Sequence, residues 1–365
     1  METTVSKLNA NEGRPWLAQG LRCALGLLMA SVLVFAGSLA IEREAYAQSA
    51  KKLTKVTWAI DSFLTSLPQR VAKERGYFEE EGVDIEFRVS SMGIDTMDAI
   101  IAGGADLGVG AHYGLMMRMT KPNIGIGGFI LAWRVPVCLM ASPNIKTTAD
   151  LRGKNIAVIS GSVWDWFTQK ALDKGGVTRD KVELKSFGSP IDYLAAALRG
   201  DVDAAWFWEA NLVRAEQVLN PKGWKCLAQA TDLAPQAAID GWGPLPMSIK
   251  AAQEKPEALA GALRAYKRAA DWCVTNVDEC AKIANKTMGI PADVTKTLLP
   301  QHGYYVGVVK SSIDVMKEMK SFALERGFMA RNQDYDFDSK VLLRPAQLAF
   351  PDGGGTKMPN QATPK

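Results

Sequence analysis

The sequence contains only two histidines, His112 and His302, among its 365 residues. It also lacks an H-E-x-x-H, a C-x-x-C, a G-x-S-x-G and a P-loop pattern. These patterns mark zinc peptidases, thiol–disulfide oxidoreductases, serine hydrolases and nucleoside triphosphatases, because each sets the reacting side chains at a fixed spacing. The sequence therefore gives no sign of these enzyme classes, and it predicts neither a metal nor a cofactor.

One glycine-rich stretch imitates a dinucleotide-binding loop. Residues 108–114 read GVGAHYG, but a dinucleotide site also needs an acidic residue about 20 positions further on, to bind the ribose. No Asp or Glu lies between Leu107 and Ala149, so this interpretation fails. Within the stretch, His112 can donate to a ligand or serve as a structural residue at a helix start, and both hypotheses stay open.

A surplus of one charge is also missing. The chain has 43 Lys and Arg against 39 Asp and Glu, a formal net charge of +4 at pH 7, and its longest basic run is the pair at 51–52. Binding to the phosphates of a nucleic acid needs a concentrated basic face. The sequence therefore predicts no nucleic-acid partner.

Only one long hydrophobic run is present, near the start of the chain. Residues 23–41 carry no charge, follow a basic start and precede the sequence Ala-Tyr-Ala at 45–47. This order is typical of a secretory signal peptide, so we predict that residues 1–47 are removed before Gln48 and that the protein is exported to the periplasm. An uncleaved membrane anchor is the alternative, because the run is of borderline length for a span.

The mature chain would keep 318 of the 365 residues, enough for two domains. It would also keep four cysteines, an even number in an oxidising compartment. On one continuous helix Cys273 and Cys280 would lie about 10 Å apart, too far to bridge. A helix cap at Asn276 would bend the chain and bring them within reach. A disulfide between Cys273 and Cys280 is therefore one hypothesis, and a disulfide between Cys138 and Cys226 is another.

Short apolar strands alternate with helical stretches along most of the chain. This order predicts parallel sheets flanked by helices. The strands divide near residues 134–140 and 240–248, so that a middle lobe is inserted between two parts of an outer one. The predicted organisation is a first lobe at 48–134, a second lobe at 135–240, a mainly helical completion of the first lobe at 241–350 and a disordered tail at 351–365.

Four stretches carry a resemblance to a known family, and they occur in the family's order. They are AKERGYFEEEGV at 72–83, DAIIAGGADLG at 98–108, TADLRGKNIAV at 148–158 and LRGDVDA at 198–204. Together they resemble the periplasmic solute-binding proteins of nitrate-, taurine- and sulfonate-type ABC transporters, a group that includes relatives of the thiamine-pyrimidine-precursor-binding proteins. The glycines in these stretches lie where helices end and strands begin, positions that often require a positive φ.

The resemblance implies an α/β, two-lobed periplasmic binding protein of type II. Each lobe would be a mainly parallel sheet flanked by helices, and two crossing strands would join the lobes. Such a protein is a monomer that closes about its hinge over a small molecule and delivers it to the membrane permease of an ABC importer. It is not an enzyme. An alternative in the same family is a biosynthetic enzyme that makes the thiamine pyrimidine with a reactive histidine and cysteines, but the sequence shows no matching cluster.

The ligand pocket is expected between the lobes, where strand carboxyl ends and helix amino ends converge. From the first lobe and first crossing, the candidate ligand-binding residues are Trp58, Asp61, Ser62, Ser91, Met92, His112, Tyr113 and Trp133. From the second lobe and the return crossing they are Gly161, Ser162, Trp164, Asp165, Trp208, Glu209, Asp240 and Trp242.

The residue types in this set favour an organic ligand. A single Trp is more often part of a hydrophobic core, but here aromatic residues recur at several loop edges and often beside an acid. Indole faces suit flat rings and cations, and carboxylates accept from N–H groups. The predicted ligand is therefore a small nitrogen-containing or aromatic solute. Helix amino ends such as Ser160–Gly161–Ser162 also suit an anion, so a sulfonate, taurine or carboxylate ligand is the alternative.

Overall fold

The computed structural model describes residues 53–132, 137–233, 242–302, 304, 306–307 and 310–352. The predicted signal peptide, both predicted lobe boundaries near 134 and 240, and residues 353–365 of the predicted tail lie outside these ranges. None of the helices within these ranges is both long enough and apolar enough to cross a bilayer.

The first sheet is built from four strands and a bridging residue. Strands β1 (Thr54–Ile60) and β2 (Val83–Val89) pair in parallel, and β3 (Ile124–Ala132) pairs antiparallel with β9 (Trp242–Ser248). Leu107 joins the two pairs, because it bridges Trp58 in parallel and Met247 antiparallel. Helices α2 (Leu67–Glu74), α3 (Tyr77–Glu80), α4 (Gly93–Ile101) and α5 (His112–Arg118), with the 3-10 turn η1 (Leu64–Ser66), connect the strands.

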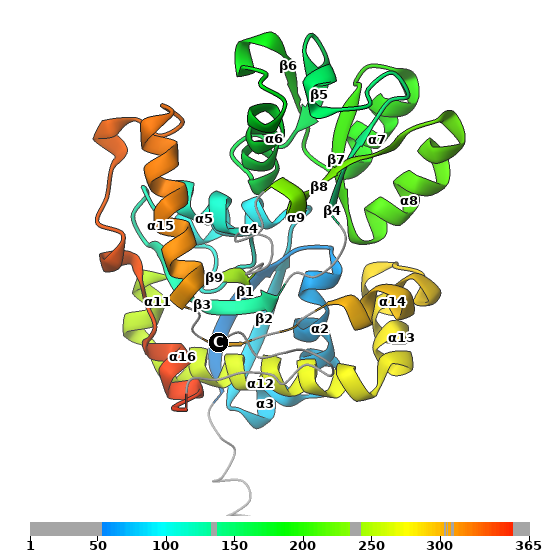
Figure 1. The fold of residues 1–365 in the computed structure, drawn as a ribbon. Helices are drawn as coiled ribbons and strands as arrows, with labels where there is room; N and C mark the ends of the chain where they lie inside the picture. Colours follow the sequence, from blue (N-terminus) through cyan, green and yellow to red (C-terminus); the bar gives the residue numbers. More distant parts are fainter. Residues whose placement is uncertain are drawn as a thin grey trace, which may run out of the picture. The chain divides into compact units, whose positions relative to one another are not determined.

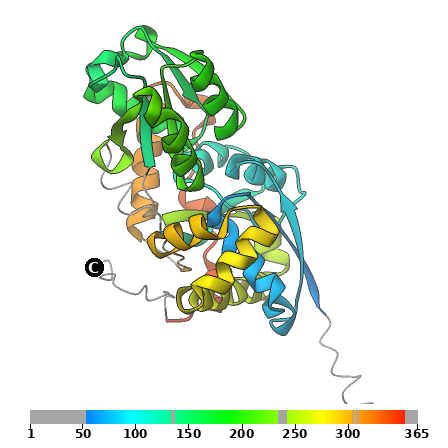
Figure 2. The ribbon, with the colours of Figure 1, turned by 90° about the vertical axis from the view of Figure 1, so that its right-hand side faces the viewer.

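The second sheet lies wholly between β3 and β9 in the sequence. Its strands are arranged in the order β6 (Glu183–Ser186), β5 (Asn155–Val158), β7 (Ala204–Trp208), β4 (Val137–Ala141) and β8 (Lys225–Gln229). Between them run α6 (Val163–Lys174), α7 (Pro190–Arg199), α8 (Glu209–Leu219) and α9 (Ala230–Leu233), with the 3-10 turns η2 (Thr148–Leu151), η3 (Arg179–Lys181) and η4 (Asn220–Lys222). Figures 1 and 2 show these green elements gathered apart from the first sheet.

The chain therefore forms two lobes, and it crosses from one to the other between β3 and β4 and returns before β9. The sheets are mixed rather than mainly parallel. In the second sheet β5 pairs in parallel with β6 and β7, whereas β4 pairs antiparallel with β7 and β8. Both antiparallel pairs in this sheet involve β4, the first strand after the crossing. Neighbouring strands are parallel where a helix connects them in a strand–helix–strand repeat, and β4 enters the sheet outside that repeat.

Helices after β9 complete the first lobe. They are α11 (Ile249–Glu254), α12 (Pro256–Thr275), α13 (Val277–Met288), α14 (Ala292–Leu298) with η5 (Leu299–Gln301), and α16 (Arg344–Ala349). Gly261 of α12 lies against the carbonyl of Glu81, where an added Cβ would come within 3.0 Å of the oxygen. This close approach lets the alanine-rich face of α12 pack onto the first lobe.

Helix α15 (Lys310–Glu325) contacts both lobes, which the sequence did not predict. Arg326, just after it, forms an ion pair with Asp173 of α6 at 3.7 Å, and the Lys170 ammonium of α6 lies 4.6 Å from the Phe322 ring. The chain then passes through the turns η6 (Arg331–Gln333) and η7 (Asp338–Lys340) before it reaches α16. Between these two turns, the Tyr335 hydroxyl donates to the Met116 carbonyl of α5 at 2.8 Å. In Figure 1 this orange helix runs beside α5 and α6.

The structure contains both hypothesised disulfides. Helix α12 ends at Thr275, Asn276 leaves the helical conformation, and α13 begins at Val277. The break brings the Cα atoms of Cys273 and Cys280 to 5.6 Å, and their sulfurs are bonded. Cys138 of β4 is bonded to Cys226 of β8, its neighbour in the second sheet.

Candidate functional site

A cavity lies between the lobes and is lined by residues of both. Its volume of about 60 Å³ is several times the roughly 10–15 Å³ that one water needs, so it has room for more than a single water. The first lobe contributes Asp61, Phe63, Thr65, Met92, Gly93, Ile94, Val109, Gly110, Ala111, Gly114, Ile130 and Gly243, and the second contributes Ser162, Val163, Trp164 and Trp208.

Aromatic side chains form the wall on the second-lobe side. The rings of Trp164 and Trp208 stack with centroids 4.2 Å apart and planes at 21°. Trp208 ends β7 and Trp164 lies in the first turn of α6, so the two rings come from a strand and the neighbouring helix. Behind them Trp206 is in the core and donates its indole N–H to Thr168 Oγ1 at 2.9 Å. The wall offers an apolar face to a flat group.

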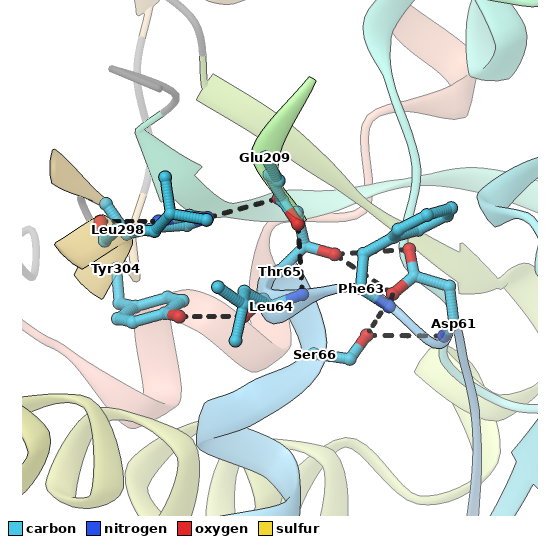
Figure 3. Close-up of polar contacts among 9 residues, drawn as sticks. Asp61, Phe63, Leu64, Thr65, Ser66, Glu209, Leu298 and Tyr304 are labelled. Atoms are coloured by element: carbon cyan, nitrogen blue, oxygen red, sulfur yellow. Dashed lines mark hydrogen bonds and ion pairs between the residues drawn. The ribbon is translucent and has the colours of Figure 1, made fainter. Parts of the chain in front are cut away.

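Of the cavity-lining residues that the structure describes, Asp61 is the only Asp, Glu, Lys, Arg or His. Its Oδ1 accepts from the Phe63 N–H at 3.1 Å, from Thr65 Oγ1 at 2.9 Å and from Ser66 Oγ at 2.8 Å (Figure 3). Burial raises the pKa of this carboxyl to about 6, and the charge of Glu209 acts in the same direction, against the hydrogen bonds. Among the described residues, Oδ2 accepts from one donor, the same Thr65 hydroxyl, at 3.2 Å, so it keeps more capacity to accept from a ligand than Oδ1 does.

Three helices begin at the cavity. Gly93 starts α4, Ala111 precedes α5, and Ser162 caps α6 by accepting from the Trp164 N–H at 3.2 Å. All three residues line the cavity. The first N–H groups of a helix have no partner within the helix, and they carry a partial positive charge. The cavity therefore offers backbone donors as well as the Asp61 acceptor.

Five of the predicted binding residues line this cavity: Asp61, Met92, Ser162, Trp164 and Trp208. Three others, Ser62, Ser91 and Glu209, line a separate groove between α8 and the α13–α14 turn. Gly161 precedes the cap of α6 and takes φ +71°. Trp133, Asp240 and the side chain of Trp242 lie outside what the structure describes.

The structure places the remaining predicted residues away from the cavity lining. Trp58 has no exposed surface and donates to the Gly108 carbonyl at 3.1 Å inside the first lobe. The reason is the period of β1, because alternate residues of a strand share a face and Trp58 therefore points with Val56 and Ile60 into the core.

His112, Tyr113 and Asp165 lie just behind the lining. His112 packs against Phe129, with 6.1 Å between the rings, and burial lowers its pKa to about 4. Burial raises the pKa of Tyr113 to about 12, and the charge of Asp165 adds to this effect. Asp165 accepts from Arg179 Nη2 at 2.6 Å. These side chains support the wall instead of forming it.

The lining also contains residues that the sequence did not single out as binding residues, among them Thr65, Ile94, Val109, Ile130 and Val163. Most are apolar, and an apolar residue near a helix start has no pattern that separates a cavity wall from a core. The described residues contain no group of three or more His, Cys, Asp or Glu that could hold a metal ion.

Comparisons with known proteins agree with this architecture. A family model described as NMT1/THI5 like matches residues 65–280, more than half of the chain. A Brucella abortus sequence named as a binding protein is 26% identical over 238 residues, which cover 65% of this chain and 72% of that protein.

Two solved structures share the fold at low sequence identity. The periplasmic aliphatic sulphonate-binding protein of Escherichia coli superimposes with a TM-score of 0.65 at 19% identity, covering 79% of this chain and 91% of that one. The periplasmic nitrate-binding protein of Synechocystis does so with a TM-score of 0.64 at 15% identity, covering 83% and 90%.

Proposed function

The chain belongs to the NMT1/THI5-like family, and we propose from this that it is an extracytoplasmic solute-binding receptor. It closes two lobes over one small organic molecule and passes that molecule to the membrane permease of an ABC importer. The observation that carries the proposal is the cavity between the lobes, to which both contribute. The names of the relatives, a binding protein and two periplasmic receptors, support it.

The polar groups on the lining favour binding over catalysis. Thr65 Oγ1 donates to Asp61, and Ser162 Oγ donates to the Ile159 carbonyl while it caps α6. Neither hydroxyl bonds to a histidine, lysine or cysteine, as an activated nucleophile would. A family member that makes a thiamine pyrimidine is the enzymatic alternative, and multiple turnovers of a bound compound would identify it.

We propose a flat, nitrogen-bearing solute with at least one N–H group. The Trp164–Trp208 wall suits a planar ring, and Asp61 is an acceptor with no Lys or Arg beside it among the described residues of the lining. In that part of the lining an anion would find helix amino ends but no cationic side chain. The amino ends of α4, α5 and α6 nevertheless make a sulfonate or carboxylate the second candidate.

Mass spectrometry of small molecules released from gently purified protein tests this proposal, followed by titration of the compounds found. We expect one planar, N–H-bearing compound, and saturable binding with one site per chain. A panel of alkyl sulfonates, taurine and small carboxylates is the matched comparison. If one of these compounds binds tightly and nitrogen heterocycles do not bind, the solute is a sulfonate or carboxylate, the second candidate.

Export completes the proposal, because the periplasm is where the predicted signal peptide would deliver the chain and where the two structural relatives are named as acting. The mature protein is proposed to begin at Gln48 and to act as a monomer. The chain mass of the protein recovered from a periplasmic extract checks the first point, and its mass under native conditions checks the second. A chain that keeps Met1 and stays with the membrane fraction would be incompatible with cleavage.

A further inference from the structure

Glu209 forms a contact that crosses from one lobe to the other. It is the first residue of α8, it directly follows the cavity residue Trp208, and its φ of +49° is rare for a residue with a side chain. This backbone turns the carboxylate towards the first lobe. There Oε2 accepts from the Leu64 N–H at 3.1 Å, and Oε1 lies 3.1 Å from Nε2 of His302 (Figure 3).

The protons of this contact can be counted from its geometry. Nδ1 of His302 lies 3.1 Å from the Leu298 carbonyl, and a carbonyl only accepts, so Nδ1 carries a hydrogen. A neutral imidazole has one N–H, which leaves Nε2 as an acceptor. Nε2 would then face Oε1, an acceptor of an ionised carboxylate. The 3.1 Å contact therefore requires one further proton, on Nε2 or on Oε1.

We propose that closure of the two lobes takes up one proton at the Glu209–His302 pair, so that the closed form becomes more stable as the pH falls. The inference rests on the proposed receptor function, because closure is what traps the solute. Glu209 and His302 are positioning residues in this account. Their contact connects the second lobe to the first beside the cavity. Glu209 directly follows Trp208, and it also accepts from Leu64 within the Asp61–Ser66 segment.

The charged and titratable groups around the pair support uptake of a proton. Both side chains of the pair are 1% exposed. In the loop between β1 and η1, Asp61 has a pKa that is raised mainly by burial and partly by the charge of Glu209. From α2, Arg70 Nη2 donates to the Asp61 carbonyl at 2.9 Å. The bonds that Arg70 donates go to the main-chain carbonyls of Ser66 and Asp61. Without the added proton the buried Glu209 carboxylate would face a neutral imidazole, and an uncompensated buried charge is unfavourable.

The other elements packed against the pair add no buried positive charge among the described residues. Tyr304, whose ring lies 5.6 Å from that of His302, donates to the Leu64 carbonyl at 2.7 Å and stays neutral because burial raises its pKa far above the usual range. Arg214 of α8 and the α14 residues Asp293 and Lys296 are exposed.

Linkage sets the size of the effect. Because closure takes up one proton, the closed population relative to the open one falls by up to about tenfold for each unit by which the pH rises.

Small-angle X-ray scattering of the mature chain without solute tests the proposal, at intervals from pH 5.5 to 8.5, with tryptophan fluorescence in parallel. Wild type is expected to expand as the pH rises. The matched variant is Glu209→Gln, because a Gln amide donates to a neutral His302 Nε2 while its carbonyl accepts from Leu64. This variant keeps the contact without the extra proton, so its scattering should not change with pH above about pH 7, where Asp61, with a pKa of about 6, is ionised.

A second variant, His302→Gln, guards against misfolding of the first, since its amide can donate to Glu209 and does not titrate. Loss of the pH response in either folded variant supports the proposal. It is overturned if wild type shows no expansion, or if both variants expand as wild type does. Because no solute is present, failure here leaves the receptor function standing, and failure of solute binding leaves this result unchanged.

Discussion

The ring of Phe63 in the first lobe lies 5.5 Å from the ring of Trp208 in the second, with the planes at 56°. Trp208 in turn stacks on Trp164. One aromatic cluster therefore spans the two lobes at the cavity, and any rigid-body opening separates Phe63 from Trp208 but leaves the Trp164–Trp208 pair together.

The Trp164–Trp208 stack predicts a specific optical signal. Two indoles 4.2 Å apart should couple and give an exciton couplet in the far-ultraviolet circular dichroism spectrum. Trp208→Phe should reduce the couplet to what the Trp164–Trp206 pair, 6.3 Å apart, still gives. It should also weaken solute binding by about 1–3 kcal/mol, since an anchoring ring is reduced. Trp206→Phe is the control, because Trp206 lies behind the wall; it should keep most of the binding. Equal losses of affinity in the two variants would mean that Trp208 acts only through packing.

Truncation of Trp208 should also cost stability. The side chain is only 2% exposed, so Trp208→Ala leaves a cavity and should lower the free energy of unfolding of the solute-free protein by about 3–5 kcal/mol. Thermal melting without solute measures this. A melt that matches wild type would indicate that the ring lies open to solvent in the free protein, in a more open conformation than the one described.

Asp61 predicts the charge of the solute. Asp61→Asn removes a carboxylate acceptor from the cavity, so binding of a solute that donates an N–H should weaken by about 1–3 kcal/mol. An anionic solute should instead bind more tightly, because a like charge is lost. Titration of the same compound into both proteins decides between the two classes by the sign of the change.

Asp61 and His112 should act on stability in opposite directions between about pH 4 and 6.5. The pKa of Asp61 rises from 3.8 to about 6 on burial, so its contribution is present below pH 4 and is lost as the pH rises through about 6. The pKa of His112 falls from 6.5 to about 4, so its contribution is present above pH 6.5 and is lost as the pH falls. Each amounts to on the order of 3 kcal/mol.

The two contributions largely cancel in wild type, and single substitutions should reveal them. Urea unfolding of Asp61→Asn should show stability that rises from pH 4 to pH 6.5, and His112→Gln should show the reverse. Parallel pH profiles for the two variants would be inconsistent with these burial effects.

The two disulfides should differ in their effect on stability. Cys138 and Cys226 are 88 residues apart in sequence, and Cys273 and Cys280 only 7. From the entropy of loop closure in the unfolded chain, we expect that replacing the first pair by serines lowers the free energy of unfolding by about 4.6 kcal/mol. The same replacement of the second pair should lower it by about 2.4 kcal/mol. Urea unfolding of the two double variants gives the comparison, and a larger loss from the short loop would point to packing instead of chain entropy.

Much of the fold follows from local sequence patterns. Apolar and polar side chains alternate along residues 83–89, which is the period of a strand, and these residues form β2. The break at Asn276 ends α12 where the cap predicted. Local patterns also placed Asp61, Ser162 and Trp208 at the ends of strands or the starts of helices, and these residues line the cavity.

The contacts between the lobes could not be predicted in this way. Glu209 and His302 are 93 residues apart, and no periodicity links a helix start in one lobe to a 3-10 turn in the other. Trp58 shows the opposite difficulty. Its position near a strand end favours a cleft, but the strand period turns it into the core. Likewise, nothing in the local pattern of α15 indicates that it contacts both lobes.

The central claim is that the cavity between the lobes binds one solute without changing it. Isothermal titration with the compound released from the purified protein, followed by mass analysis of the ligand after prolonged incubation, measures both parts. The account predicts one site per chain, affinity reduced in Trp208→Phe and Asp61→Asn, and a ligand of unchanged mass. Steady conversion of the compound over many turnovers, or binding that neither substitution alters, would contradict it.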